Sequence, residues 1–112
     1  MPEIKIPKIN PVNSTPAWHL YIIQLNLERV KVGRREIFEA LRAEKIGVNV
    51  HYIPVHLQPY YQKRFGYRRG DFPKAENYYS RAITLPIFPK MTEKDINDVV
   101  KAVKKVINYY KC

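Results

Sequence analysis

The chain has 112 residues, a single cysteine at its last position, and 20 Lys and Arg against 10 Asp and Glu, which gives a formal net charge of +10. This length fits one domain with its own core, and a single cysteine excludes an intrachain disulfide scaffold. No run approaches the roughly 20 apolar residues of a membrane span or the apolar region of a secretory signal, so we expect a cytoplasmic protein without a membrane partner.

The positive charge is spread along the chain in pairs and never forms a run of five basic residues. An excess of this size attracts polyanions, but a nucleic-acid-binding arm would show its basic residues clustered. We therefore interpret most of these side chains as solvated helix faces and expect no specific nucleic-acid partner.

The N-terminal part is predicted to be an extended lead-in followed by a strand. Residues 1–16 contain four prolines. Proline denies the backbone donors that helices and sheet ladders need, so we expect an extended segment outside the core. Residues 17–25 are aromatic and β-branched and nearly continuous in apolarity, which predicts a central strand with both faces covered.

A helix and a second strand are predicted next. Residues 33–45 place Ile37, Phe38 and Leu41 on one stripe opposite the charged residues, which is typical of an amphipathic helix, and Gly47 is expected to stop it. Residues 47–52 alternate as a short strand, which Pro54 ends.

The second half is predicted to be mainly helical. Residues 60–67 allow about two helical turns and then a loop, and Pro73 suits the first position of a helix that runs to residue 82. A short strand near 83–87 and a helix over 92–110 complete the chain. Thr92 caps the last helix, with Asp95 three residues later, and its apolar face consists of Ile96, Val99, Val100, Val103, Ile107 and Tyr110.

The sequence lacks the motifs of the common catalytic classes. It has no Gly-x-Ser-x-Gly, and its four glycines fit neither glycine-rich phosphate-binding motif. His51 and His56 are separated by Pro54 and cannot share one helix face, so no metal site is predicted. The stretch from His51 to His56 nevertheless combines imidazoles, an aromatic ring and a rigid turn, a mixture that suits the binding of a polar ring.

Seven segments, taken in their order, resemble a known family. They are Ala17-Trp18-His19-Leu20-Tyr21, Gly47-Val48-Asn49-Val50-His51-Tyr52-Ile53-Pro54-Val55-His56, Pro59-Tyr60-Tyr61, Phe65-Gly66-Tyr67, Phe72-Pro73-Lys74-Ala75-Glu76, Leu85-Pro86-Ile87-Phe88-Pro89 and Met91-Thr92. From Ala17 onward the series resembles the C-terminal part of the DegT/DnrJ/EryC1/StrS aminotransferases, which are pyridoxal-phosphate-dependent sugar aminotransferases of fold type I. The second and third segments are most similar to members that aminate a UDP-linked 4-keto-6-deoxy-N-acetylhexosamine on the route to pseudaminic acid.

The resemblance implies a division of labour between two domains. In such enzymes the Schiff-base lysine, the acid that pairs with the pyridine nitrogen and the phosphate-binding groups lie in a large domain that precedes the part matched here. No residue of this chain corresponds to them, so we assign no catalytic or cofactor-binding residue and expect no activity and no bound cofactor in this chain alone. The small domain forms one wall of the substrate cleft, and the matching residues are His51, Tyr52, Ile53 and Pro54.

We therefore expect an α+β fold in which a small antiparallel or mixed sheet packs against helices. Residues 17–112 would be the small C-terminal domain of an aminotransferase that moves an amino group from glutamate to a UDP-linked 4-keto-6-deoxy sugar. The partners implied are the nucleotide sugar, the large domain and a second subunit in a homodimer. Two alternatives stay open, namely a small basic nucleic-acid-binding protein and a stand-alone interaction module.

Overall fold

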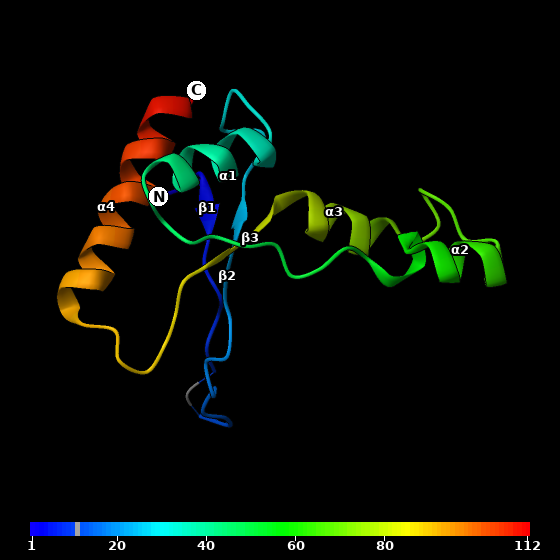
Figure 1. Ribbon diagram of the computed structural model, residues 1–112, viewed down its shortest axis with the longest axis horizontal. Helices are drawn as coiled ribbons and strands as arrows, with labels where there is room; N and C mark the ends of the chain where they lie inside the picture. The colour runs from blue at the N-terminus through cyan, green and yellow to red at the C-terminus, as the bar shows by residue number, and fades with distance from the viewer. Residues whose placement is uncertain (11) are drawn as a thin grey trace.

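The computed structural model describes residues 1–10 and 12–112, so residue 11 of the predicted lead-in lies outside the described residues. A three-stranded antiparallel sheet packs against helices, which confirms the predicted α+β fold (Figure 1). The elements in chain order are β1 (Ile4–Lys5), β2 (Tyr21–Leu25), α1 (Arg34–Ala43), the 3-10 helix η1 (Val55–Leu57), α2 (Pro59–Phe65), α3 (Pro73–Arg81), β3 (Ala82–Leu85) and α4 (Glu93–Tyr110).

Strand β2 lies at the centre of the sheet, as predicted for the apolar run that contains it. Its Leu25 pairs with Ile4 of β1, and its Ile23 pairs with Ile83 of β3. Two residues of the predicted lead-in therefore form the edge strand β1. Because alternate side chains of a strand point to the same face, Ile23 and Leu25 lie buried together, whereas Ile22 on the other face remains partly exposed.

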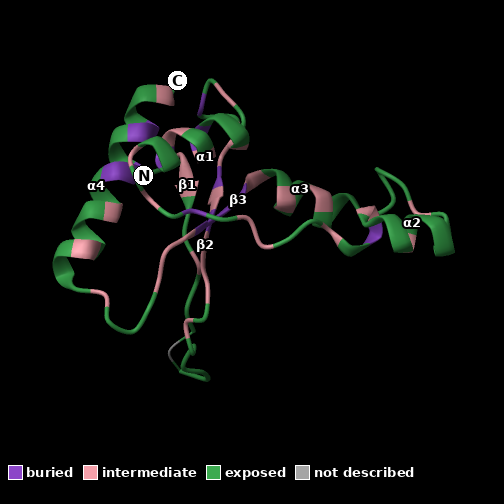
Figure 2. Ribbon diagram, viewed as in Figure 1, coloured by how far each residue is buried: buried purple, intermediate pink, exposed green. Residues whose placement is uncertain are grey.

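One core cluster joins the sheet to helices α1 and α4. It includes Ile23 and Ile83 from the strands, Ile37 and Leu41 from α1, and Ile107 from α4, each at most 1% exposed. Burial of one such side chain stabilises the fold by about 1.5–3 kcal/mol. Figure 2 shows buried residues on α1, α4 and the strands where these elements meet, and a further buried position on the arm.

The apolar face predicted for α4 is divided between core and surface. Its C-terminal half buries Val103 and Ile107, but Ile96 and Val100 are 49% and 43% exposed. The first half of α4 thus has an exposed apolar face that no described residue of the core covers.

The strand predicted over 17–25 is confirmed from Tyr21 to Leu25 and is wrong for residues 17–20. The backbone of Trp18 has φ of 45°, in the left-handed region, which no strand contains. The Trp18 ring instead packs 5.4 Å from the ring of Tyr21. A nonglycine residue in this conformation is strained by about 1–3 kcal/mol. The pattern of apolar and β-branched residues that predicts a strand carries no signal for such a residue.

The strand predicted over 47–52 is wrong, because only one residue of this segment pairs with the sheet. Asn49 exchanges two backbone hydrogen bonds with Thr84 of β3, of 3.0 and 2.8 Å. The side chain of Asn49 then accepts the N–H of Val50 at 2.8 Å, and the ladder stops there. A local side-chain bond has replaced the next step of strand pairing.

The helices follow their sequence signals closely. Pro59 and Pro73 occupy the first turns of α2 and α3, and α4 begins with the predicted capping box between Thr92 and Asp95. A cap of this kind stabilises a helix by about 1 kcal/mol. The predicted stop of α1 at Gly47 is wrong: the helix ends at Ala43, and Lys45 takes the left-handed conformation, with φ of 64°. None of the described helices is long and apolar enough to cross a membrane.

Residues 55–81, comprising η1, α2, α3 and the connecting loop, project from the sheet as an arm (Figure 1). Neither α2 nor α3 contains a buried residue. The chain has a radius of gyration of 15.8 Å. A compact domain of this length would have a radius of gyration of about 13 Å, so the arm makes the molecule extended. At the root of the arm, Arg34 donates to the carbonyl oxygen of Tyr79 and lies 4.3 Å from the centroid of its ring.

Candidate functional site

The structure brings the four predicted site residues together in one turn that links the Asn49–Thr84 bridge to η1. His51 leads this turn, and its ring is partly buried against the sheet. Its Nδ1 lies 2.8 Å from Oγ1 of Thr84, a side chain that is only 5% exposed on β3. Because Nδ1 is engaged and Nε2 makes no hydrogen bond within the described residues, the ring is held in one orientation with its second nitrogen available to a ligand.

The remaining residues of the turn supply apolar surface. Tyr52 is 70% exposed and Ile53 is 53% exposed, while Pro54 is partly buried. The Tyr52 ring packs edge-on against His51, with ring centroids 4.6 Å apart. A fixed imidazole beside exposed aromatic and aliphatic surface can hydrogen-bond a hydroxyl of a polar ring and cover one of its faces.

Sequence reasoning missed Thr84, which orients His51 from a position 33 residues further along the chain. The sequence contains one indication of this role, because Thr84 is the only hydroxyl residue in the apolar run Ala82-Ile83-Thr84-Leu85. Buried hydroxyls in strands require a hydrogen-bond partner, so such a residue predicts a polar contact without naming the partner.

The second histidine of the motif, His56, belongs to the packing of the arm. It is 6% exposed, and its Nε2 lies 3.2 Å from Oε2 of Glu76 on α3. The ring of Phe72 lies 4.8 Å from that of His56, and Glu76 also accepts the N–H of Gly70 at 2.9 Å. These contacts tie η1, the loop after α2 and α3 into one unit.

The carboxyl group of Glu76 has a pKa below its ordinary value. Partial burial acts to raise this pKa, but hydrogen bonds from the Gly70 N–H and the His56 ring, together with the attraction of His56, outweigh it. Because the folded-state pKa is lowered, Glu76 makes its full contribution to the free energy of unfolding at pH values above its unfolded-state pKa of about 4.3. It is lost as the pH falls through the lower folded-state value.

Glu76→Gln is expected to loosen the loop between α2 and α3 at neutral pH. The acceptor of the Gly70 N–H is the Glu76 carboxylate. The amide resonance of Gly70 should therefore titrate in the wild-type chain with an apparent pKa below about 4.3. The variant should lose that titration step, and its loop resonances should shift toward values typical of flexible chains. Two-dimensional NMR across the acidic range makes the measurement.

Glu39→Gln provides the control, since it removes the same charge from a solvent-exposed i,i+4 pair with Arg35. It should leave the Gly70 titration unchanged. A wild-type titration at or above the ordinary glutamate pKa would show that Glu76 does not hold the loop as described.

The described residues do not fit a resident pyridoxal phosphate. Every described lysine is exposed, and the only buried polar side chains among them are His56 and Thr84. A Schiff-base lysine and a carboxylate paired with the pyridine nitrogen both require enclosure, which no lysine or acidic residue of the described chain has. The described residues also contain no cluster of three His, Cys, Asp or Glu side chains that could hold a metal ion.

The chain matches a known protein family in sequence. Residues 1–104 match the DegT/DnrJ/EryC1/StrS aminotransferase family. The spore coat polysaccharide biosynthesis protein SpsC of Bacillus subtilis is 49% identical over 92 residues, which cover 81% of this chain and 24% of that protein. The chain spans about a quarter of the length of the curated relatives it matches.

Solved structures agree with the family match. DesV of S. venezuelae, solved in complex with a ketimine intermediate, superposes with a TM-score of 0.79 and 30% identity over 93% of this chain and 26% of its own. PseC of Helicobacter pylori, an aminotransferase involved in the biosynthesis of pseudoaminic acid, superposes with a TM-score of 0.73 and 25% identity over 82% of this chain and 24% of its own. The sequence motifs, the fold and these matches agree, and the chain belongs to the DegT/DnrJ/EryC1/StrS aminotransferase family.

Proposed function

We propose that this chain is the small domain of a pyridoxal-phosphate-dependent sugar aminotransferase and forms one wall of its substrate cleft. The observation that carries the proposal is the turn from His51 to Pro54, whose imidazole is fixed by Thr84 while Tyr52 and Ile53 stay exposed. Binding residues are commonly found on such loops, positioned by a rigid scaffold. The cofactor and the catalytic lysine belong to the large domain of the full-length enzyme.

The substrate we propose is a nucleotide-linked 4-keto-6-deoxy sugar, with UDP as the nucleotide and glutamate as the amino donor. The motif from Val50 to His56 followed by Pro59-Tyr60-Tyr61 supports the pseudaminic acid subgroup within the family. The similarity to PseC and to a spore coat polysaccharide biosynthesis protein is in line with this choice.

We further propose that residues 17–112 dock on the large domain in a homodimeric cytoplasmic enzyme, with residues 1–16 leading into them. The side chains of Ile96 and Val100 on α4 are exposed. An exposed apolar face of this kind supports a covering partner. Exposure of Tyr60 on the arm supports a second contact region.

A substrate panel tests the proposed function. The full-length enzyme is incubated with glutamate and UDP-4-keto-6-deoxy-N-acetylhexosamine, with the same keto sugar freed of UDP, or with UDP-N-acetylglucosamine, which has no keto group. Mass spectrometry should detect replacement of the 4-keto oxygen by an amino group in the first compound alone. If no keto sugar is aminated, the proposed function is wrong, whereas preference for another nucleotide would overturn only the subgroup.

A further inference from the structure

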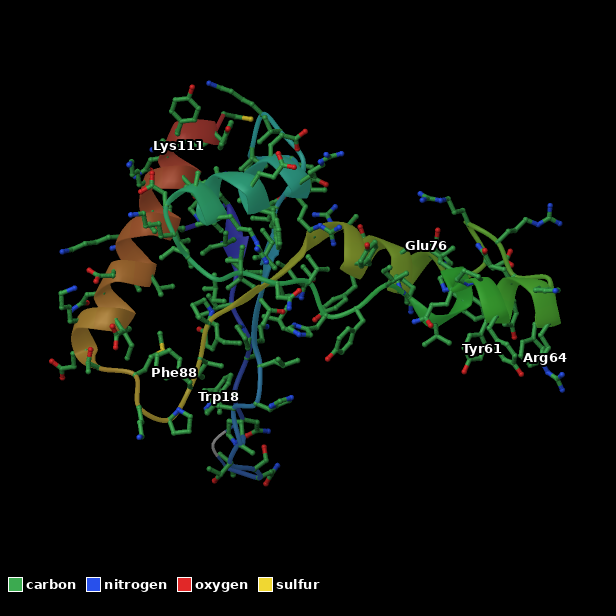
Figure 3. The ribbon with its side chains drawn as sticks, in the orientation of Figure 1. Trp18, Tyr61, Arg64, Glu76, Phe88 and Lys111 are labelled. Carbon is green, nitrogen blue, oxygen red and sulfur yellow. The ribbon has the colours of Figure 1, made fainter. Side chains whose placement is uncertain are left out.

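The far end of the arm carries four basic side chains that make no salt bridge within the described residues. They are Lys63 and Arg64 at the end of α2, and Arg68 and Arg69 in the loop that follows. All four are exposed, and Figure 3 shows Arg64 pointing outward at the tip. Other surface cations, such as Lys101 and Lys104, also lack a salt bridge within the described residues. The tip differs from them because its four basic side chains lie within residues 63–69.

The two acidic residues nearest to this cluster in sequence accept hydrogen bonds from backbone N–H groups. Asp71 accepts the N–H of Arg68 at 2.9 Å, and Glu76 accepts the N–H of Gly70 and contacts His56. Their charges therefore fix the loop and do not pair with the guanidinium groups. The φ of Gly70 is 95°, so this loop shape needs glycine at that position.

Aromatic rings form a continuous series beside the basic cluster. Tyr61 stacks on Phe65 with centroids 6.2 Å apart, Phe65 stacks on Tyr67 at 5.6 Å, and Tyr67 meets Phe72 edge-on at 5.2 Å. The guanidinium of Arg64 lies 5.6 Å from the Phe65 centroid. The side chain of Phe65 is 54% exposed. The series therefore presents aromatic surface to solvent beside the basic side chains.

We propose that the tip of the arm, residues 63–69, binds the phosphate groups of the nucleotide-linked substrate, with Phe65 as a stacking surface for its base. Guanidinium groups match phosphate in planar, two-point hydrogen bonds, and their rigid fork means that less entropy is lost for each hydrogen bond formed. Exposed aromatic rings stack on bases of any sequence. The proposal rests on the proposed function, because it assigns a part of that same substrate.

The length of the arm is compatible with one ligand that contacts both regions. From Pro54 the chain reaches Phe65 through η1, one extended residue and α2. The rise per residue of these conformations makes this a path of about 20 Å at most. The loop that carries Arg68 and Arg69 lies back toward η1, because the N–H of Gly70 donates to Glu76 and Glu76 contacts His56. The diphosphate is bonded directly to the sugar, so a ligand at the His51 turn is reached by the extended side chains of Arg68 and Arg69 on this loop rather than by the outermost end of α2.

Binding to the purified chain tests the site directly. Pyrophosphate, UDP, uridine and a short single-stranded RNA are titrated separately while NMR follows the amides of residues 63–70. Pyrophosphate and UDP should bind saturably at these amides, uridine should bind much more weakly, and RNA should show no preference for the tip. The double variant Arg68→Gln/Arg69→Gln should weaken UDP binding by about tenfold or more.

Lys101→Gln/Lys104→Gln on α4 is the matched control, because it removes the same two positive charges from exposed positions away from the tip. It should change UDP affinity less than about twofold. Equal losses in both double variants would mean that the net charge of +10 attracts the anion without a site, and tighter binding of RNA than of UDP at the tip would point to nucleic acid. Either result overturns the proposal.

Kinetics of the full-length enzyme separate this proposal from the proposed function. Arg68→Gln/Arg69→Gln should raise KM for the nucleotide-linked sugar by about tenfold and leave kcat and the KM for glutamate unchanged, as expected when uniform binding is lost. An active aminotransferase whose KM for the sugar does not respond would keep the proposed function and overturn the phosphate site. If the enzyme aminates no keto sugar, the proposed function itself is wrong.

Discussion

His51→Ala in the full-length enzyme should lower kcat/KM for the nucleotide-linked sugar by a few-fold to about tenfold, while cofactor binding is unchanged. A net hydrogen bond between neutral groups contributes about 0.5–1.5 kcal/mol, and the free Nε2 of the fixed ring can make one such bond to a substrate hydroxyl. The proposed function assigns the cofactor groups to the other domain, so the visible absorbance of the enzyme should stay at the wild-type level. Steady-state kinetics and absorbance spectra make the two measurements.

Two further variants distinguish a binding role of His51 from a structural one. His51→Asn can keep the contact that Nδ1 makes with Thr84 but leaves no atom at the position of Nε2. This variant should therefore keep the Tm near wild type and lose kcat/KM as much as His51→Ala does. Thr84→Val keeps the imidazole but releases its orientation, so a smaller loss in the same direction is expected. If His51→Ala lowers Tm and leaves kcat/KM intact, His51 is structural and the site assignment is wrong.

The helices of this chain could be predicted from sequence because their signals are local. Thr92 and Asp95 cap α4 through bonds that span three residues, and Pro73 begins α3 at the position where a missing N–H costs nothing. The segment around Asn49 failed for the opposite reason. Its alternating pattern fits a strand, but its pairing is decided by Thr84, and the side chain of Asn49 ends that pairing after one residue. The pattern of residues 47–52 alone does not show whether the Asn49 side chain or pairing with Thr84 determines the backbone conformation.

The candidate site was predictable as a stretch of sequence but not as an arrangement in space. The turn from His51 to Pro54 is a candidate because it matches a family motif, and the structure adds Thr84 as the group that orients His51. His56 lies in the same motif, and only its contact with Glu76, 20 residues away, shows that it supports the arm. Sequence spacing could not separate these two roles, because both histidines have the same chemistry and differ only in their long-range partners.

The purified 112-residue chain should retain no pyridoxal phosphate after dialysis and should not transaminate any keto sugar. A stable internal imine needs an amine that is largely unprotonated, which burial in a cationic or apolar pocket provides. No lysine of the described residues is buried, and Lys94 has a raised pKa because its ammonium group donates to Asp98 and is attracted by that carboxylate. Imines that form at such exposed amines hydrolyse as free cofactor is removed.

The control is the full-length enzyme, which should keep its visible absorbance through the same dialysis because the proposed function places the enclosed lysine and the phosphate site in the large domain. Borohydride reduction before dialysis, followed by peptide mass spectrometry, records where any imine formed on the isolated chain. Sub-stoichiometric labels scattered over several exposed lysines are the expected result. A single lysine labelled in full, whose substitution abolishes an absorbance that survives dialysis, would show that this chain holds the cofactor by itself, and the division of labour between the two domains would have to be abandoned.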